Sequence, residues 1–151
     1  MSEFEPKNPD YAQAVRDGFG RQPFMAHLGA RLTAIEPGRV EIRLPYRDEV
    51  GQNHGFFHGG AIGAIADVSG GFAGFSLMGK GGSVLTVEYK INIVAPGLGE
   101  ELIGRGEVIR MGGTLIITEA RLYVLRDGAE SLCAIALQTL RGKQTGREVA
   151  F

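Results

Sequence analysis

The stretch that decides the fold runs from His58 to Gly79 and reads HGGAIGAIADVSGGFAGFSLMG. It is the longest apolar run in the chain, and Asp67 is its one formally charged residue. About 22 residues rise about 33 Å as a helix, whereas strands in globular proteins rarely exceed about ten residues. The length therefore predicts a helix over residues 58–79. A helix that is apolar almost all round is a buried one.

Glycine makes this helix unusual. Gly63, Gly70, Gly71 and Gly74 lie inside it, and each glycine costs about 1 kcal/mol of helix stability relative to alanine. Because missing side chains let a neighbouring backbone approach closely, we expect a sheet to wrap tightly around the helix. A lone carboxylate on such a helix is expensive to desolvate, so Asp67 is the first functional candidate.

A membrane helix is the alternative interpretation of this stretch. Gly59 and Gly63, like Gly70 and Gly74, have the GxxxG spacing by which membrane helices dimerise. However, a carboxylate near the helix centre costs about 2.5 to 3.5 kcal/mol on insertion scales, and no arginine or lysine flanks the start of the run. We therefore predict a buried helix and no membrane contact.

Composition limits the classes of function. The 151 residues predict a single domain over 1–151, and 44% hydrophobic with 22% charged residues is typical of globular proteins. A net charge of −1 gives no electrostatic reason to expect nucleic acid as a partner. The single cysteine, Cys133, cannot form an internal disulfide. The N-terminus lacks the apolar core of a secretory signal, so we expect a cytoplasmic protein.

The rest of the chain predicts short helices and amphipathic strands. We expect an N-terminal helical segment over 1–28, with helices at 11–17 and 23–28. Period-two alternation and turn residues predict strands at 32–35, 39–46, 85–93, 102–110, 114–125 and 131–140. Short connections demand antiparallel neighbours. Together these elements predict an α+β fold with about six strands around one helix. One sheet covers one side of the helix, so the apolar other side predicts a homodimer.

The turn that leads into the helix, Gln52–Gly60, reads QNHGFFHGG. A helix N-terminus offers unpaired backbone N–H groups and a positive dipole end, which suit a carbonyl oxygen that gains negative charge. Gly59 and Gly60 leave that end uncovered. The local pattern also fits a helix start whose glycines serve tight packing, and both interpretations stay open at this point.

The string QNHGFFHGGAIGAIAD, residues 52–67, resembles the signature of hotdog-fold acyl-CoA thioesterases of the phenylacetic-acid-degradation (PaaI-like) type. That family carries an Asn-Gly-x-Gly-x-x-His-Gly-Gly element and an Asp or Glu nine residues after the histidine. His58 and Asp67 have this spacing. The resemblance covers most of the chain, because the predicted strand order, the helix position and the strand ending IVAP at Pro96 also match.

The resemblance implies roles for named residues. Asp67 would be the nucleophile, or the general base that activates water against the thioester carbonyl. The backbone N–H of Gly59 would polarise that carbonyl, and His58 would orient the loop. Gln52 stands where the family usually has asparagine, which keeps the amide but lengthens its arm by one methylene. A hydroxyl at Thr86 could position water, although strict alternation would place Thr86 on the face of Glu88, Lys90 and Asn92.

The resemblance also implies the partners of the site. The active site would lie at a homodimer interface, with the Gly59 loop of one subunit facing Asp67 of the other, and pairing of dimers into a tetramer is left open. No metal and no cofactor are expected beyond the CoA carried by the substrate. We assign substrate binding to residues of the turn and the helix: Gly60, Asn53, Phe57 and Ser69. The acyl group, small or medium, aryl or aliphatic, is left open, with Phe24, Phe56, Phe72 and Phe75 as further candidates for its pocket.

Other functions fit parts of the same pattern. His54, His58 and Asp67 could be drawn as a metal site, but glycines at positions 55 and 59 disfavour a helical HxxxH arrangement. No histidine follows Ser69 or Ser76, which disfavours a serine-hydrolase triad. A hotdog dehydratase would usually show a proline-containing element before the helix, which is absent here. A non-catalytic acyl-CoA-binding module using the same groove remains the alternative from a different class.

Overall fold

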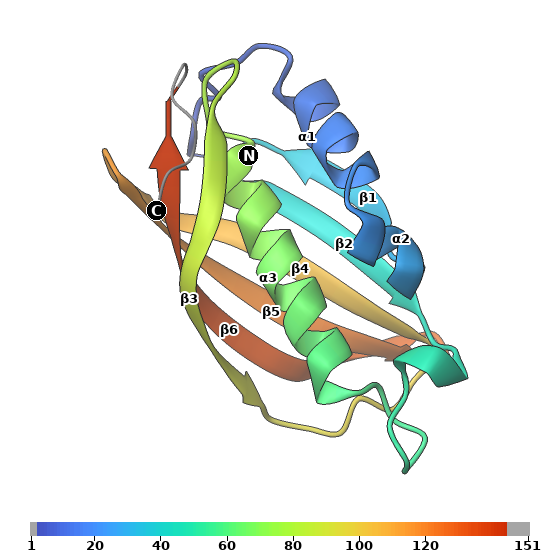
Figure 1. Ribbon diagram of the computed structural model, residues 1–151. Helices are drawn as coiled ribbons and strands as arrows, with labels where there is room; N and C mark the ends of the chain where they lie inside the picture. The colour runs from blue at the N-terminus through green and yellow to red at the C-terminus, as the bar shows by residue number, and fades with distance from the viewer. Residues whose placement is uncertain (1–2, 145–151) are drawn as a thin grey trace.

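The computed structural model describes residues 3–144, in which one curved sheet wraps around one long helix (Figure 1). The long helix, α3 (Gly59–Phe75), lies on the concave face of the sheet, and α1 (Tyr11–Gly20) packs against the sheet edge ahead of the shorter α2 (Pro23–Leu28). The strands are β1 (Arg31–Glu36), β2 (Arg39–Pro45), β3 (Ser83–Ile93), β4 (Glu101–Met111), β5 (Leu115–Arg126) and β6 (Ala129–Lys143), and a 3-10 turn, η1 (Asp48–Val50), precedes α3.

All neighbouring strands are antiparallel, in the order β1-β2-β4-β5-β6-β3. This α+β arrangement is the hotdog fold, so the prediction of about six antiparallel strands around one central helix is confirmed. Tight turns such as Asp127-Gly128, both with positive φ, join the hairpins. The order leaves β1 and β3 as the two edges of the sheet.

The central helix ends earlier than predicted, at Phe75 rather than Gly79. Ser76 explains this difference, because its hydroxyl donates to the Ala73 carbonyl at 2.7 Å and accepts from the Gly38 N–H at 2.8 Å. These bonds tie the last turn of α3 to the β1–β2 hairpin. Leu77 and Met78 then continue as a buried turn, so their apolar character reflects burial rather than helix.

The sheet wraps tightly around α3, as predicted, and the glycines that bring the two backbones together lie on β4. A methyl group at Gly106 of β4 would overlap the backbone of Ser69 and Gly70 in α3. A methyl group at Gly104, two residues earlier in the same strand, would overlap the Ile65 side chain. The contact with α3 therefore leaves no room for a side chain at either glycine of β4.

A β-bulge changes the face on which Thr86 lies. Thr86 pairs with Leu140, but Glu88 pairs with Thr139, so Val87 is an extra residue in β3. Leu140 is buried on the helix-facing side of the sheet. Thr86 therefore faces α3, whereas Glu88 lies on the outer face, and the strict alternation expected along this strand is wrong at this point.

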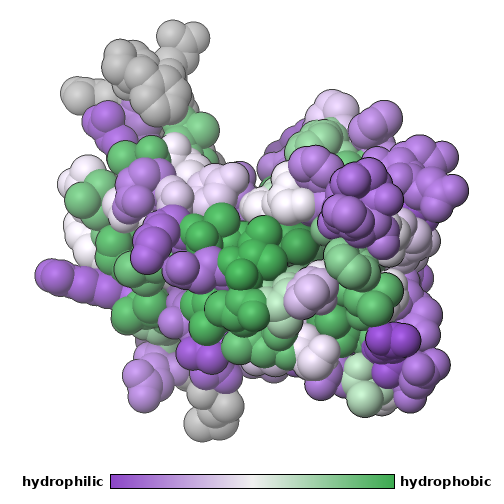
Figure 2. All heavy atoms as spheres, turned by 90° about the horizontal axis from the view of Figure 1, so that it is seen from below, coloured by the Kyte–Doolittle hydropathy of each residue, from purple (hydrophilic) through white to green (hydrophobic). Residues whose placement is uncertain are grey.

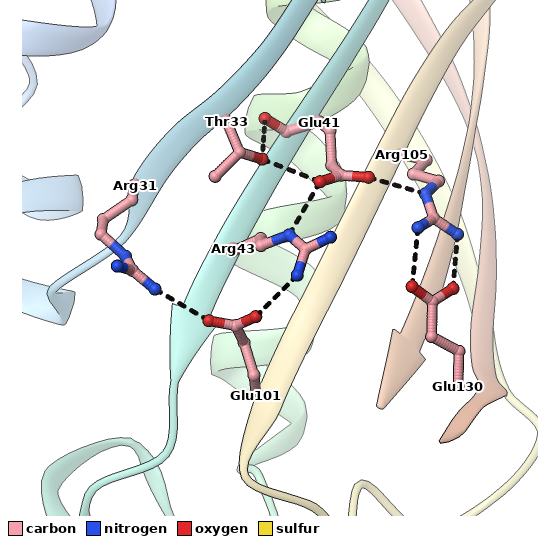
Figure 3. Close-up of polar contacts among 7 residues, drawn as sticks. All are labelled: Arg31, Thr33, Glu41, Arg43, Glu101, Arg105 and Glu130. Atoms are coloured by element: carbon pink, nitrogen blue, oxygen red, sulfur yellow. Dashed lines mark hydrogen bonds and ion pairs between the residues drawn. The ribbon is translucent and has the colours of Figure 1, made fainter. Parts of the chain in front are cut away.

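The outer face of β1, β2 and β4 carries paired charges (Figure 3). Glu41 accepts hydrogen bonds from Arg43 at 2.8 Å and from Arg105 at 2.9 Å, and Arg105 also holds Glu130 at 2.7 Å. Burial alone would raise the pKa of Glu41, but the hydrogen bonds from Arg43, Arg105 and Thr33 outweigh burial and lower it. This part of the outer face is polar.

Two sequence expectations concern the membrane and the C-terminus. Within residues 3–144, no helix combines the length and the hydropathy that crossing a membrane requires. The sequence also predicts an exposed tail over residues 143–151; Lys143 is the last residue of β6, and residues 145–151 lie outside the described part of the chain.

The helix–sheet contact predicts opposite effects for two glycine-to-alanine changes. Gly106→Ala pushes a methyl group into the α3 backbone, so we expect a loss of about 3 kcal/mol or more in the free energy of unfolding. Gly71→Ala points its methyl group into open space and gains helix propensity, which should add about 0.4 to 1 kcal/mol. Urea unfolding measures both, and equal stability of the two variants would contradict the close packing.

Candidate functional site

The first half of the candidate site is the N-terminus of α3. His58 is the N-cap, and its Nδ1 accepts a hydrogen bond from the Gly60 N–H at 2.8 Å. Gly59 and Gly60 are exposed, and the Gly59 N–H makes no hydrogen bond within residues 3–144. This exposed N–H, at the positive end of the helix dipole, is suited to an oxygen that carries negative charge.

The loop before the helix is held by its own hydrogen bonds. The Gln52 N–H donates to the Phe56 carbonyl at 2.9 Å, and the Gln52 carbonyl accepts from Gly55 at 3.0 Å. The side-chain oxygen of Gln52 accepts from the His54 N–H, while its amide nitrogen makes no hydrogen bond among the described residues. Asn53 is exposed at the tip of this turn. Gln52 thus presents a free donor close to the helix start.

The second half of the site surrounds Asp67, which is half-buried in the middle of α3. The Thr86 hydroxyl donates to Asp67 Oδ1 at 2.7 Å, and Gln138 Nε2 donates to the same oxygen at 2.5 Å. Among the described residues no group donates to Oδ2. The carboxylate is therefore held by one oxygen and free at the other.

Gln138 is a member of the site that the sequence analysis missed. It lies on β6, is 1% exposed, and its Oε1 accepts from the Thr118 hydroxyl at 2.9 Å. The available signal was its position, since Ala134, Ala136 and Leu140 make the rest of this strand face apolar. A single polar residue on a buried apolar face needs partners, and Asp67 and Thr118 supply them.

A cleft of about 410 Å³ opens beside the carboxylate. It lies between α3, the beginning of β3 and the end of α1, and both Asp67 and Thr86 line it. Its apolar walls include Phe72 and Phe75, whose rings pack edge to face at 5.9 Å, and Arg21 is the other charged residue of the lining. Asp67 Oδ2 can therefore meet a molecule that enters from solvent.

Two residues assigned to substrate binding lie inside the subunit. Phe57 is 2% exposed and its ring packs against Tyr46, with centroids 5.2 Å apart. Ser69 is fully buried, and its hydroxyl donates back to the Ala66 carbonyl at 3.1 Å. Within one subunit both side chains contribute to packing. The structure brings Asp67 and Thr86 together, and it gathers Gln52, Asn53, His58, Gly59 and Gly60 at the helix start.

Other parts of the described chain offer less chemistry. Residues 3–144 contain no group of three His, Cys, Asp or Glu side chains arranged to hold a metal ion. Cys133 is buried, and burial raises the pKa of its thiol, which makes it a poor nucleophile. A groove of about 380 Å³ on the outer face of the sheet is lined by Arg105, Glu41 and Tyr123, but these charges are already paired. Asp67 is the best-placed reactive group.

Comparison with protein families gives an independent line of evidence. The family model described as "Thioesterase superfamily" matches residues 54–131, which include the helix start, Asp67 and Thr86. A thioesterase family protein from Silicibacter pomeroyi has a crystal structure that is 45% identical, covers 89% of this chain and 99% of its own, and superposes with a TM-score of 0.87.

More distant relatives agree in fold or in part of the sequence. The PaaI protein of the E. coli phenylacetic acid degradation operon is 15% identical over 93% of this chain and 96% of its own, with a TM-score of 0.79, a likeness of fold alone. The proofreading thioesterase EntH of Klebsiella pneumoniae is 32% identical over 50% of this chain. The chain spans 55% of the length of that curated relative and 65% of another, a candidate esterase of Saccharolobus solfataricus.

The N-cap predicts a specific loss of stability. His58→Ala removes the acceptor for the Gly60 N–H, so we expect a loss of about 1 kcal/mol in the free energy of unfolding. His58→Asn keeps a capping acceptor and should recover most of that loss. His54→Ala, at an exposed histidine of the same loop, is the control and should stay within about 0.5 kcal/mol of the parent protein. Urea denaturation gives all three values, and a larger loss at His54 would contradict the capping role.

Proposed function

The chain belongs to the thioesterase superfamily, and from this premise we propose that it hydrolyses the thioester of a small or medium acyl-CoA to the free acid and CoA. The observation that carries the proposal is the state of the Asp67 carboxylate. Thr86 and Gln138 both donate to Oδ1, whereas Oδ2 has no donor among the described residues, and the side chain borders the cleft. A carboxylate anchored at one oxygen can use the other as a base or as a nucleophile without losing its position.

Two routes lead from this arrangement to the same products. As a general base, Oδ2 takes a proton from water, the hydroxide adds to the thioester carbon, and the C–S bond breaks with the thiolate of CoA as leaving group. As a nucleophile, Oδ2 adds to the same carbon, the thiolate leaves, and water hydrolyses the anhydride that has formed. Both routes place negative charge on the carbonyl oxygen, which needs hydrogen-bond donors.

The exposed N–H of Gly59 is the donor that we assign to this oxygen, but it must come from a second subunit. Gly59 and Asp67 are eight residues apart on one helix, which corresponds to about 12 Å along its axis. A reacting carbonyl has to lie about 3 Å from the base and about 3 Å from the oxyanion donor. One chain cannot meet both conditions, so the helix start of one subunit should face Asp67 of the other.

The edge strand β3 is the surface that we propose for this pairing. Among residues 3–144 no strand pairs with its outer edge, and Tyr89 and Ile93 on its helix-facing side are 43% and 48% exposed. Figure 2, which looks at the end of the molecule where α3 begins, shows a hydrophobic patch bordered by polar residues. The exposed apolar residues Val94 and Leu98 lie at this end. Antiparallel pairing of two β3 strands across a twofold axis would satisfy both edges.

The cleft beside Asp67 is the space that we propose for the acyl group. Its walls combine Val68, Phe72 and Phe75 of α3 with Val84 and Leu85 of β3. A volume of about 410 Å³ falls within the range typical of small-molecule pockets. Apolar walls next to a single carboxylate suit an uncharged acyl group whose carbonyl carbon ends near Oδ2.

Removing the charge of Asp67 tests the proposal directly. Release of free thiol is measured from a panel of short, medium and aryl acyl-CoAs. Asp67→Asn keeps the shape of the side chain but lacks the basic oxygen, so kcat should fall by about a hundredfold or more. Asp10→Asn, at an exposed carboxylate before α1, is the control and should keep the parent rate. Binding of acyl-CoA by the parent protein without thiol release would replace this proposal with a binding module.

Weakening the β3 surface tests the assembly. Ile93→Glu places a charge in the proposed interface, so light scattering should show the mass of a monomer at concentrations where the parent protein is a dimer. Ile109→Glu is the matched control, because Ile109 is 52% exposed on β4, away from β3. A monomeric parent protein, or equal dissociation in both variants, would exclude β3 as the interface.

A further inference from the structure

We propose that Gln138 is the positioning residue for Asp67, and that Thr118 and Gly70 hold its amide in the orientation that this role requires. The inference rests on the proposed function, because it assigns to Gln138 the task of keeping one oxygen of the reacting carboxylate in place. Gln138 is 71 residues from Asp67 in the sequence and reaches it from β6, across the interior of the fold.

The contacts of the Gln138 amide nitrogen converge on Asp67. Nε2 lies 2.5 Å from Asp67 Oδ1, 3.1 Å from the Asp67 backbone carbonyl oxygen and 3.1 Å from Thr86 Oγ1. The Thr86 hydroxyl in turn donates to Oδ1 at 2.7 Å. One amide therefore hydrogen-bonds both the side chain and the backbone of Asp67, which limits rotation of the carboxylate about the side-chain bonds.

The orientation of the amide follows from the chemistry of its neighbours. Asp67 Oδ1 and the Asp67 carbonyl oxygen both accept and cannot donate, so the NH2 end of Gln138 has to face them. The opposite end, Oε1, accepts from the Thr118 hydroxyl at 2.9 Å. Thr118 is fully buried and sits directly across from Gln138 in the β5–β6 ladder. Hydrogen bonds are thus donated in one direction, from Thr118 to Gln138 and from Gln138 to Asp67.

Gly70 provides the space that this amide occupies. A methyl group at Gly70 would overlap Gln138 Oε1 and would crowd Thr118 Oγ1. The helix therefore lacks a side chain at the point where the Thr118–Gln138 pair crosses under it. This assigns a second purpose to a glycine that lies within the close contact of α3 and β4.

Packing alone does not account for these residues. The neighbours of Gln138 on the inner face of β6 are Ala136 and Leu140, and an apolar side chain at position 138 would avoid the burial of an amide. Thr118 likewise has an apolar counterpart of equal shape in valine. Two buried polar residues whose hydrogen bonds end on the one carboxylate that borders the cleft are explained by a role at that carboxylate.

The main test compares Gln138→Met with the parent protein. Methionine has a similar length but no hydrogen-bond donor, so Asp67 Oδ1 keeps only the hydrogen bond from Thr86. We therefore expect kcat to fall about ten- to a hundredfold, with KM changed by less than about threefold.

Thr118 supplies a second and milder test. Thr118→Val keeps the shape and releases Oε1, so kcat should fall about three- to tenfold, whereas Thr118→Ser keeps the hydroxyl and should restore most of the rate. Because Thr118 acts through Gln138, Thr118→Val should have no further effect in the Gln138→Met background. Thr139→Val is the matched control, since Thr139 is the next residue of β6 and its hydroxyl bonds Glu88 on the outer face.

The outcomes separate this inference from the proposed function. If the parent protein releases no thiol, or if Asp67→Asn keeps the parent rate, the proposed function fails. If Asp67→Asn is inactive but Gln138→Met and Thr118→Val stay within twofold of the parent kcat, only the role of Gln138 fails. A slower Gln138→Met in which Thr118→Val adds its full effect, or a Thr118→Ser variant as slow as Thr118→Val, would show a structural role and would also overturn the inference. Should Gln138→Met not fold, the Thr118→Val and Thr118→Ser pair decides alone.

Discussion

The contact between α3 and β4 at backbone distance is the constraint on which the rest of the structure depends. A methyl group at Gly106 would overlap the helix backbone at Ser69 and Gly70, so β4 tolerates no side chain there. This contact buries one side of α3 against the sheet and brings Gln138 of β6 within reach of the helix. Gly70 and Gly74, which would weaken an isolated helix, leave room for Gln138 and Leu140 of β6, and this packing offsets their cost.

Close packing makes the few polar groups in the interior interdependent. Thr118, Gln138, Thr86 and Asp67 form one chain of hydrogen bonds, and no described buried side-chain polar atom lacks a partner. An unsatisfied buried polar group costs about 1 to 3 kcal/mol, so removing one member of the chain affects the others. The result is a carboxylate with one fixed oxygen and one free oxygen at the edge of an apolar cleft. That asymmetry is the feature that a hydrolytic role requires.

The geometry of one helix also separates the two halves of the site. The N–H groups at the helix start and the carboxylate of Asp67 lie about 12 Å apart along the axis, so they cannot serve one carbonyl within a subunit. In the proposed dimer, the edge of β3 and the exposed apolar residues at this end of the molecule would let a second subunit complete the site. The proposed assembly and the proposed chemistry would then both depend on α3.

The sequence by itself determined those features that depend on neighbouring residues. The apolar run predicted the central helix, period-two alternation predicted six strands, and Asp67 was singled out as the one charge in the apolar run and by the family resemblance. Only the tertiary structure decided that α3 ends at Phe75, that the bulge at Val87 turns Thr86 toward Asp67, and that Gln138 completes the site. The physical reason is that helix ends, bulges and contacts across 71 residues are set by which strands pair and in which register, and no local pattern contains that information.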